Sequence, residues 1–274
     1  MKQRSIVLVD FSECSASALK FAYQWSLNTG AELLVLHQLQ IGSPGFTSIE
    51  SEKAILESEK EAATSKMKAF LDINLNEKKK PQLLISSLSL PNQIDELSKD
   101  SNLKNIIFIG LKGTGVLKRI FIGSEAIRVI ENTRNMVIAI PKDCKIQSID
   151  KLNIAVSEDF NLNLLELNFF LKQFNKPLPE LEFFNFSNSG TTTKKIEDLF
   201  ASLKDIYEDD FRTSCTAYKF SGNKMTGIKE LVEGQENQLI LVQKGSRYFT
   251  DYIFRKFLIN ELVYDGKIPL VVLP

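Results

Sequence analysis

The sequence predicts an α/β protein made of two consecutive doubly wound domains, each a five-stranded, mainly parallel sheet flanked by helices. Short apolar runs alternate with longer segments of helical periodicity, which is typical of a parallel sheet with helices on its faces. The same order of elements then occurs a second time, and the two series meet near residues 144–150. We therefore expect one domain at residues 1–145 and another at residues 146–274.

The first elements are predicted from apolar runs and their flanking residues. Residues 6–9 are all apolar, which suits a parallel strand buried on both faces. Residues 15–27 have apolar side chains at helical spacing, with Ser12 or Ser15 as the expected N-cap and Gly30 as the expected end. A second buried strand is expected at residues 33–36. The charged segment 49–71 has a single apolar stripe, which predicts a long amphipathic helix.

The remaining elements of the first half continue the alternation. A weak strand is expected at residues 83–85, followed by a helix at 93–98 that begins after a proline. Residues 105–109 form the next apolar run, and a helix is expected at 124–131. A fifth strand at 136–140 is stopped by a proline. This order of strands and helices predicts a doubly wound parallel sheet.

The second half repeats this series, which we interpret as the duplication of a whole domain. The expected strands are 151–156, 181–186, 217–220, 238–242 and 268–273, and the expected helices are 164–174, 195–206, 228–233 and 250–262. Duplicated domains can reuse the interface of an ancestral dimer, so we expect a pseudo-two-fold pair. The last strand of each half is the predicted contact edge.

Composition excludes several classes of function. The chain has 34 Lys and Arg residues and 34 Asp and Glu residues, so it has no net charge to attract nucleic acid or an anionic membrane. Cys14, Cys144 and Cys215 do not form a disulfide framework or a zinc motif and are expected to be free thiols. No apolar run is long enough for a signal peptide or a spanning helix. These observations predict a cytoplasmic protein that binds neither nucleic acid nor membrane.

A glycine-rich segment directly follows the fourth strand of the first half and ends where the next helix begins. Its glycines and its final serine are Gly110, Gly113, Gly115, Gly123 and Ser124. Glycine lets a backbone turn sharply and approach a ligand closely. The free N–H groups and the dipole at a helix start favour an anion, and Lys112, Lys118 and Arg119 could add charge-assisted contacts. The segment predicts a phosphate-binding loop, although its spacing is neither a Walker A loop nor a GxGxxG fingerprint.

The spacing of these residues resembles that of ATP-binding members of the universal stress protein family. Residues 7–12, which read Val-Leu-Val-Asp-Phe-Ser, look like the first strand of the family and its Asp-x-Ser turn. Residues 30–37 look like its second strand. The resemblance covers nearly all of residues 1–143 and continues through 151–274 as a divergent second copy. It implies a Rossmann-like fold of the adenine nucleotide alpha hydrolase type.

The resemblance also implies a ligand, which is ATP or a related nucleotide, with or without Mg²⁺. Asp10 would lie against the nucleoside, with Phe11 and Ser12 in the same turn. The loop from Gly110 through Lys112, Gly113 and Gly115 would hold the ribose and phosphates together with Gly123 and Ser124. The sequence shows no acid–base pair beside this loop, so we expect a stress-response protein that is regulatory and not catalytic. The lone His37 is expected to be a packed, hydrogen-bonded core residue.

The second copy departs from this pattern. Of the loop glycines only Gly245 remains, and Asn260 and Glu261 stand where Gly123 and Ser124 would be expected. An acid persists near the Asp10 position in the turn at residues 157–159. We expect one nucleotide per chain, bound in the first half. The alternatives are a ligand-free tandem scaffold that acts through protein interactions, or a slow ATPase, and the chain could also form a homodimer.

Overall fold

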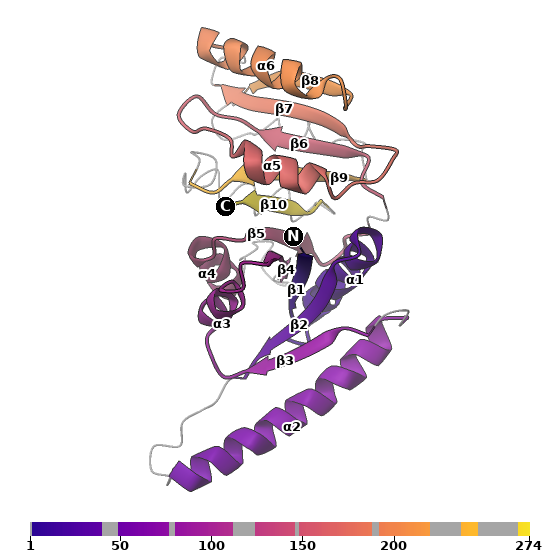
Figure 1. The fold of residues 1–274 in the computed structure, drawn as a ribbon, viewed down its shortest axis with the longest axis vertical. Coiled ribbons are helices and arrows are strands. Elements are labelled where there is room, and N and C mark those ends of the chain that lie inside the picture. Colours follow the sequence, from indigo (N-terminus) through magenta and orange to yellow (C-terminus); the bar gives the residue numbers. More distant parts are fainter. Residues whose placement is uncertain are drawn as a thin grey trace.

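The computed structural model describes residues 2–39, 49–76, 80–111, 124–145, 148–187, 192–219, 237–245 and 268–274. In these ranges all strands join one ten-stranded sheet, in the order β3-β2-β1-β4-β5-β10-β9-β6-β7-β8. Figure 1 shows the first half below and the second half above, with β5 and β10 adjacent at the centre. Both halves therefore contribute to one continuous sheet.

The first half contains five parallel strands. They are β1 (Lys2–Leu8), β2 (Glu32–Gln38), β3 (Gln82–Ser86), β4 (Leu103–Leu111) and β5 (Met136–Pro141). Its described helices are α1 (Glu13–Thr29), α2 (Ile49–Asn74), α3 (Leu90–Leu97) and α4 (Ser124–Asn132). All nine elements were expected from the sequence. The α/β class with a mainly parallel sheet is confirmed.

The second half has the same strand order, read outward from the centre. Its strands are β6 (Lys151–Ala155), β7 (Glu180–Ser187), β8 (Thr213–Lys219), β9 (Gln238–Gln243) and β10 (Leu270–Leu273). Its described helices are α5 (Leu164–Leu171) and α6 (Lys194–Tyr207). β8 begins four residues earlier than expected, because polar residues 213–216 also pair with β7. The helices expected at 228–233 and 250–262 lie outside the described residues.

The caps of α1 show how the sequence positions this helix. Ser12 is the N-cap, and its side chain accepts a hydrogen bond from the Ser15 backbone N–H. Gly30 ends the helix with a φ of 73°, a left-handed conformation that glycine adopts without strain. The buried face includes Ala18, Leu19 and Ala22, which pack against β1 and β4. These contacts fix the start of α1 at the carboxyl end of β1.

Two apolar clusters lie on opposite faces of the sheet. Buried residues of α1, α2, α5 and α6 belong to one cluster, and those of α3 and α4 belong to the other. Strand residues alternate between them, as Ile6 and Val7 do in β1. The first half is thus covered by helices on both faces, as the sequence predicts.

The two halves meet at an antiparallel pair between β5 and β10. Ile138 lies opposite Val271, with Val137 opposite Val272 and Ala139 opposite Leu270. This symmetric register is that of two equivalent strands related by a local two-fold axis. The predicted contact edge is confirmed, whereas the domain boundaries at residues 145 and 146 stay a prediction.

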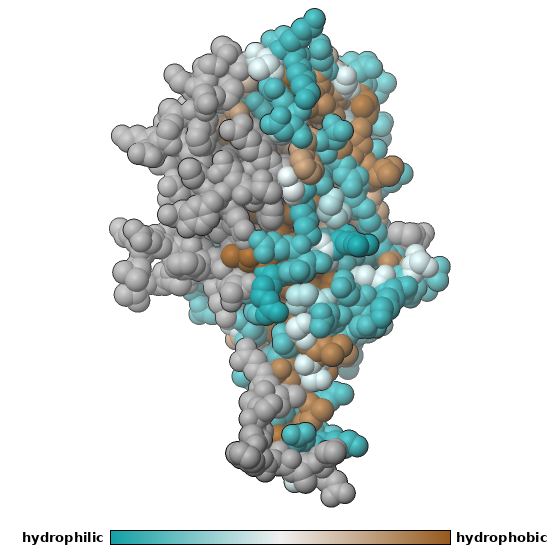
Figure 2. All heavy atoms as spheres, turned by 90° about the vertical axis from the view of Figure 1, so that its left-hand side faces the viewer, coloured by the Kyte–Doolittle hydropathy of each residue, from teal (hydrophilic) through white to brown (hydrophobic). Residues whose placement is uncertain are grey.

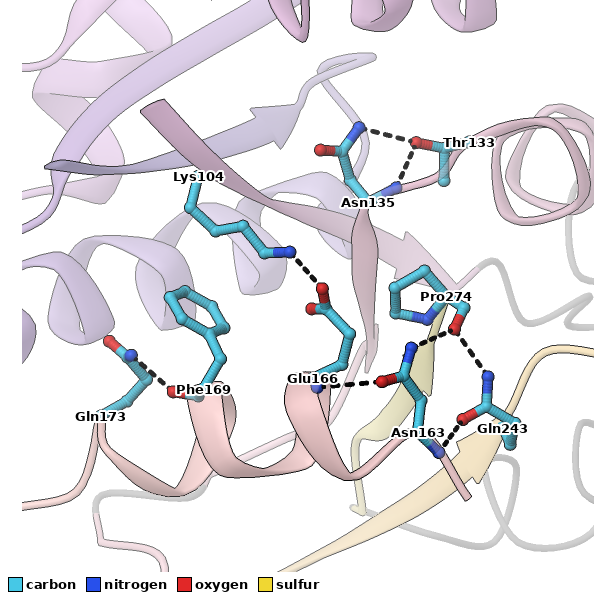
Figure 3. A network of polar contacts seen from close by, with 9 residues as sticks. All are labelled: Lys104, Thr133, Asn135, Asn163, Glu166, Phe169, Gln173, Gln243 and Pro274. Atoms are coloured by element: carbon cyan, nitrogen blue, oxygen red, sulfur yellow. Dashed lines mark hydrogen bonds and ion pairs between the residues drawn. The ribbon is translucent and has the colours of Figure 1, made fainter. Parts of the chain in front are cut away.

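Aromatic and ionic contacts extend this junction. The indole of Trp25 on α1 stacks on Phe170 of α5, with ring centroids 5.5 Å apart. Lys104 of β4 forms an ion pair with Glu166 of α5, as Figure 3 shows. Lys244, after β9, donates a hydrogen bond of 2.7 Å to the carbonyl of Thr133, which follows α4. The halves are therefore joined by backbone pairing, ring stacking and charge.

Candidate functional site

Two parts of the predicted site, the Asp10 turn and Gly110, lie together where β1 and β4 end. The strands are neighbours, and Leu8 lies opposite Ile109, so the turn at residues 10–12 and Gly110 share the carboxyl edge of the sheet. Ser124 is the first residue of α4. The predicted site residues Lys112, Gly113, Gly115 and Gly123 lie outside the described residues. The structure therefore brings together the Asp10 turn and Gly110, at the edge where open α/β sheets bind ligands.

The Asp10 turn is ordered by its own side chains. Oδ1 of Asp10 accepts hydrogen bonds from the Ser12 backbone N–H at 3.1 Å and from the Ser12 hydroxyl at 2.5 Å. The Ser12 hydroxyl in turn accepts the Ser15 N–H at 3.2 Å. The N-cap of α1 is thus Ser12, and Ser12 in turn holds the Asp10 carboxylate. The Asp10 side chain remains exposed, so its carboxylate is oriented and accessible to a ligand.

Phe11 occupies an unusual backbone conformation in this turn. Its φ is 65°, in the left-handed region that non-glycine residues rarely adopt and that costs of order 1–3 kcal/mol. Its ring lies 4.5 Å from the His37 ring and 5.6 Å from the Phe70 ring, and the Lys66 ammonium lies 4.3 Å above it. Such strain is often found at ligand sites. This conformation is not predictable from the residue type, because phenylalanine does not favour a positive φ.

A hollow of about 230 Å³ lies beside this turn. Its lining residues come from the turn, from the end of β2 and from α2, and they are Phe11, His37, Leu39, Glu59, Ala62, Ala63 and Lys66. His37 donates its Nδ1–H to the Val9 carbonyl at 2.7 Å, as expected for a packed histidine. The hollow thus has an aromatic wall and a charged rim contributed by α2.

Gly110 is required by packing within the chain. A Cβ atom at this position would lie 2.5 Å from the carbonyl carbon of Cys14 and 2.9 Å from the Ser15 nitrogen. Real Cβ atoms do not approach backbone atoms this closely, so only glycine lets the first turn of α1 lie against the end of β4. The sequence interpretation attributed this glycine to close approach by a ligand. The structure shows a reason within the chain, because the first turn of α1 lies against Gly110, and the ligand contact stays a prediction.

Two further properties bear on the predicted ligands. Among the described residues, no group of three or more His, Cys, Asp or Glu side chains is placed to hold a metal ion. At the start of α1, Glu13 forms an ion pair with Lys142, which follows β5. The hydrogen bond and charge of Lys142 lower the pKa of Glu13, so this carboxylate has a partner of its own.

No helix in the described part of the chain is long and apolar enough to cross a membrane.

The pairing registers give the equivalent positions in the two halves. Starting from the two-fold contact, the equivalent pairs are Ile138 and Val271, Phe108 and Leu241, and Val7 and Ile154. A shared hydrogen bond supports this equivalence. His37 donates to the Val9 carbonyl, and Asn185 donates to the Val156 carbonyl at 2.8 Å. Counting onward from these pairs makes Ser157 equivalent to Asp10, and Gln243 equivalent to Gly110.

This equivalence locates the acid that was expected near the Asp10 position in the second half. Ser157 is equivalent to Asp10 itself, and Glu158 and Asp159 follow it directly. The Thr193 hydroxyl donates to the Glu158 carboxylate. Lys244, next to Gly245, donates to the Thr133 carbonyl. These side chains serve contacts within the chain.

Comparisons with known proteins find the same fold. The model of the universal stress protein family matches residues 1–141. A universal stress protein from Archaeoglobus fulgidus DSM 4304 has a similar structure, with a TM-score of 0.64 and 17% identity over 98% of this chain and 97% of that chain. A putative universal stress protein from Pseudomonas aeruginosa UCBPP-PA14 gives a TM-score of 0.52 and 11% identity over 98% and 92% of the two chains. No curated protein matches the chain.

Proposed function

The chain belongs to the universal stress protein family, and from this premise we propose that it binds ATP, or a related nucleotide, at the carboxyl ends of β1 and β4. The family supports a role in the stress response. The observation that carries the proposal is the ordered Asp10 turn beside Gly110, at the sheet edge where a glycine-rich segment leads into α4. In this proposal the protein responds to the binding of a nucleotide in its first half.

Each described residue has a physical role in this proposal. The Asp10 carboxylate, held by Ser12, is an acceptor for the hydroxyl groups of a ribose. The hollow beside Phe11 and His37 offers an aromatic wall to a planar base. The start of α4 at Ser124 supplies backbone N–H groups and a helix dipole that favour phosphate. The proposal also assigns phosphate contacts to four residues on the basis of the sequence alone, namely Lys112, Gly113, Gly115 and Gly123.

A regulatory role is favoured over catalysis. His37 donates its Nδ1–H to the Val9 carbonyl, and Asp10, which accepts from Ser12, is the group that this proposal assigns to the ribose. A general base for hydrolysis has to reach an attacking water with a free acceptor. Neither group is arranged as a member of an acid–base pair. We therefore propose a binding protein whose response to ATP is a change in stability or in partners.

A ligand-free scaffold is the main alternative. Large exposed apolar side chains would be expected to gather into a patch on such a protein. Among the described residues they come from several elements and loops of both halves, namely Ile55, Ile73, Leu88, Phe160, Leu165 and Ile206. Figure 2 likewise shows a largely hydrophilic described surface on the face that it presents. This distribution of apolar side chains favours nucleotide binding over the function of a ligand-free scaffold.

Calorimetric titration of the full chain with ATP, with and without Mg²⁺, tests the proposal. We expect one nucleotide per chain and no phosphate release above background. Asp10→Asn should weaken binding by about tenfold, because an amide is a poorer acceptor than a carboxylate. Asp159→Asn in the second half is the matched control and should leave the affinity unchanged. Absence of ATP binding by the wild-type chain would refute the proposal, and steady phosphate release would favour the ATPase.

A further inference from the structure

We propose that position 110 and its counterpart Gln243 determine which half of the chain keeps a helix start able to support a ligand. The ligand part of this inference rests on the proposed function, whereas the structural part stands without it. In the first half, glycine allows α1 to begin directly after the Asp10 turn. In the second half, glutamine occupies that space and the helix begins later.

The first step is the contact in the first half. Gly110 lies against the backbone of Cys14 and Ser15, the second and third residues of α1. The same turn of helix includes the bond from the Ser15 N–H to Ser12 and the bond of 3.0 Å from the Ala16 N–H to the Ser12 carbonyl. Ser12 also orients the Asp10 carboxylate. The Asp10 geometry therefore depends on the absence of a side chain at position 110.

The second step is the arrangement in the second half. Glu13, where α1 begins, is equivalent to Phe160, but α5 begins only at Leu164, one turn further on. The Gln243 side chain lies beside the start of α5, as Figure 3 shows, and its Oε1 accepts the Asn163 N–H at 3.0 Å. Its Nε2 donates to the Pro274 carbonyl at 2.6 Å. Glutamine thus replaces the lost turn of helix with its own hydrogen bonds.

The third step is the consequence for the turn. Ser157 keeps a bond of the Asp10 type, since its hydroxyl accepts the Asp159 N–H at 3.3 Å. The N-cap of this helix, however, is Asn163, whose side chain accepts the Glu166 N–H. Asp159, which is equivalent to Ser12, does not cap the helix. The same backbone turn survives in both halves, but only glycine couples it to the helix start.

The test exchanges the residue in the first half. In Gly110→Gln, the amides of Ser15 and Ala16 should lose protection from hydrogen exchange, and ATP affinity should fall by about tenfold or more. The second half shows that this fold accommodates glutamine at the equivalent place. Gln243→Ala is the matched variant. It should leave ATP affinity within about twofold of wild type and speed the exchange of the Asn163 amide, which loses its acceptor.

The outcomes separate this inference from the proposed function. If the wild-type chain binds no ATP, the proposed function fails, but the exchange of Ser15 and Ala16 still tests the role of position 110. Unchanged protection of both amides in Gly110→Gln would overturn the inference. If that variant does not fold, Gln243→Ala decides, because unchanged exchange at Asn163 would show that Gln243 does not hold the start of α5.

Discussion

At the scale of single residues, Ser12 connects the helix to the site. Its hydroxyl accepts the Ser15 N–H and donates to Asp10, so one side chain both begins α1 and orients the carboxylate. A similar arrangement occurs at the start of α6. Thr193 accepts the Ile196 N–H and donates to Glu158. Thr193 therefore reports what such a cap contributes to stability away from the proposed site.

The first prediction uses this pair of caps. Ser12→Ala should lower the free energy of unfolding by about 1 kcal/mol, the usual cost of losing an N-cap. It should also weaken ATP binding by about fivefold, because Asp10 loses one of its hydrogen bonds. Thr193→Ala should cost a similar stability with no change in affinity. Urea unfolding and calorimetry measure the two effects, and equal affinity in both variants would contradict a role for Ser12 in the site.

Residue types explain which parts of the site were predictable. Asp10, Ser12 and Gly110 belong to local patterns of strand, turn and helix start, so their neighbourhood followed from the sequence. The left-handed φ of Phe11 and the contact of Gly110 with Cys14 did not. The first accompanies contacts of the Phe11 ring with rings from β2 and α2, and the second is packing between residues 96 positions apart in the chain. Neither cause is visible in a local pattern.

At the scale of elements, a buried ionic network ties together three strands of the second half. The Glu182 carboxylate on β7 pairs with Lys151 on β6 and accepts a hydrogen bond of 2.6 Å from Tyr218 on β8. Burial alone would raise the pKa of Glu182, but the bonds from Lys151 and Tyr218 outweigh it and lower that pKa. A carboxyl group with a lowered pKa stabilises the folded state at any pH above the pKa that it has in the unfolded chain. This contribution is lost as the pH falls through the pKa of the folded state.

The second prediction follows from this network. Glu182→Gln should lower the free energy of unfolding by about 1–3 kcal/mol at pH 7, because Lys151 keeps a buried charge without its partner. The difference from wild type should shrink as the pH falls below about 4.5. Glu180→Gln is the control on the same strand, and its exposed pair with Arg212 should contribute less than about 0.5 kcal/mol. Urea unfolding at several pH values would contradict the prediction if the two variants behaved alike.

Most elements were predictable because buried parallel strands are apolar at every position and helices have a distinct period. The start of β8 was missed since polar residues such as Ser214 and Thr216 sit on this outer strand, where pairing with β7 does not require apolar side chains. The start of α5 at Leu164 was expected from the sequence. Its contact with Gln243 was not, because Gln243 is far from α5 in the sequence and adjacent to it only after folding.

At the scale of the whole molecule, the halves share one sheet and both apolar clusters. β5 and β10 pair directly, and residues of both halves belong to the same cluster on the α1 and α5 face. The repeated order of elements predicted this contact edge. The packing of Trp25 on Phe170 across it was not predictable, because equivalent positions in α1 and α5 carry different residues.

This junction leads to the last prediction, which is that the two halves unfold together. Trp25 is the only tryptophan of the chain, it is 6% exposed, and it contacts Phe170 and Phe174 of the second half. Its fluorescence therefore reports the junction, whereas circular dichroism reports all helices and strands. If the halves stabilise each other, both signals should change at the same guanidinium concentration.

Phe170→Ala tests the cause of this coupling. Removal of a buried phenylalanine costs about 3–5 kcal/mol, and here the loss falls on the contact between α1 and α5. We expect the fluorescence transition of the variant to move to lower guanidinium concentration and to separate from the circular dichroism transition. Leu203→Ala, in the core beneath α6 and away from the junction, is the control and should shift both signals together. Two separate transitions in the wild-type chain would show that the halves are independent, because a junction that stabilises both halves cannot open before either of them.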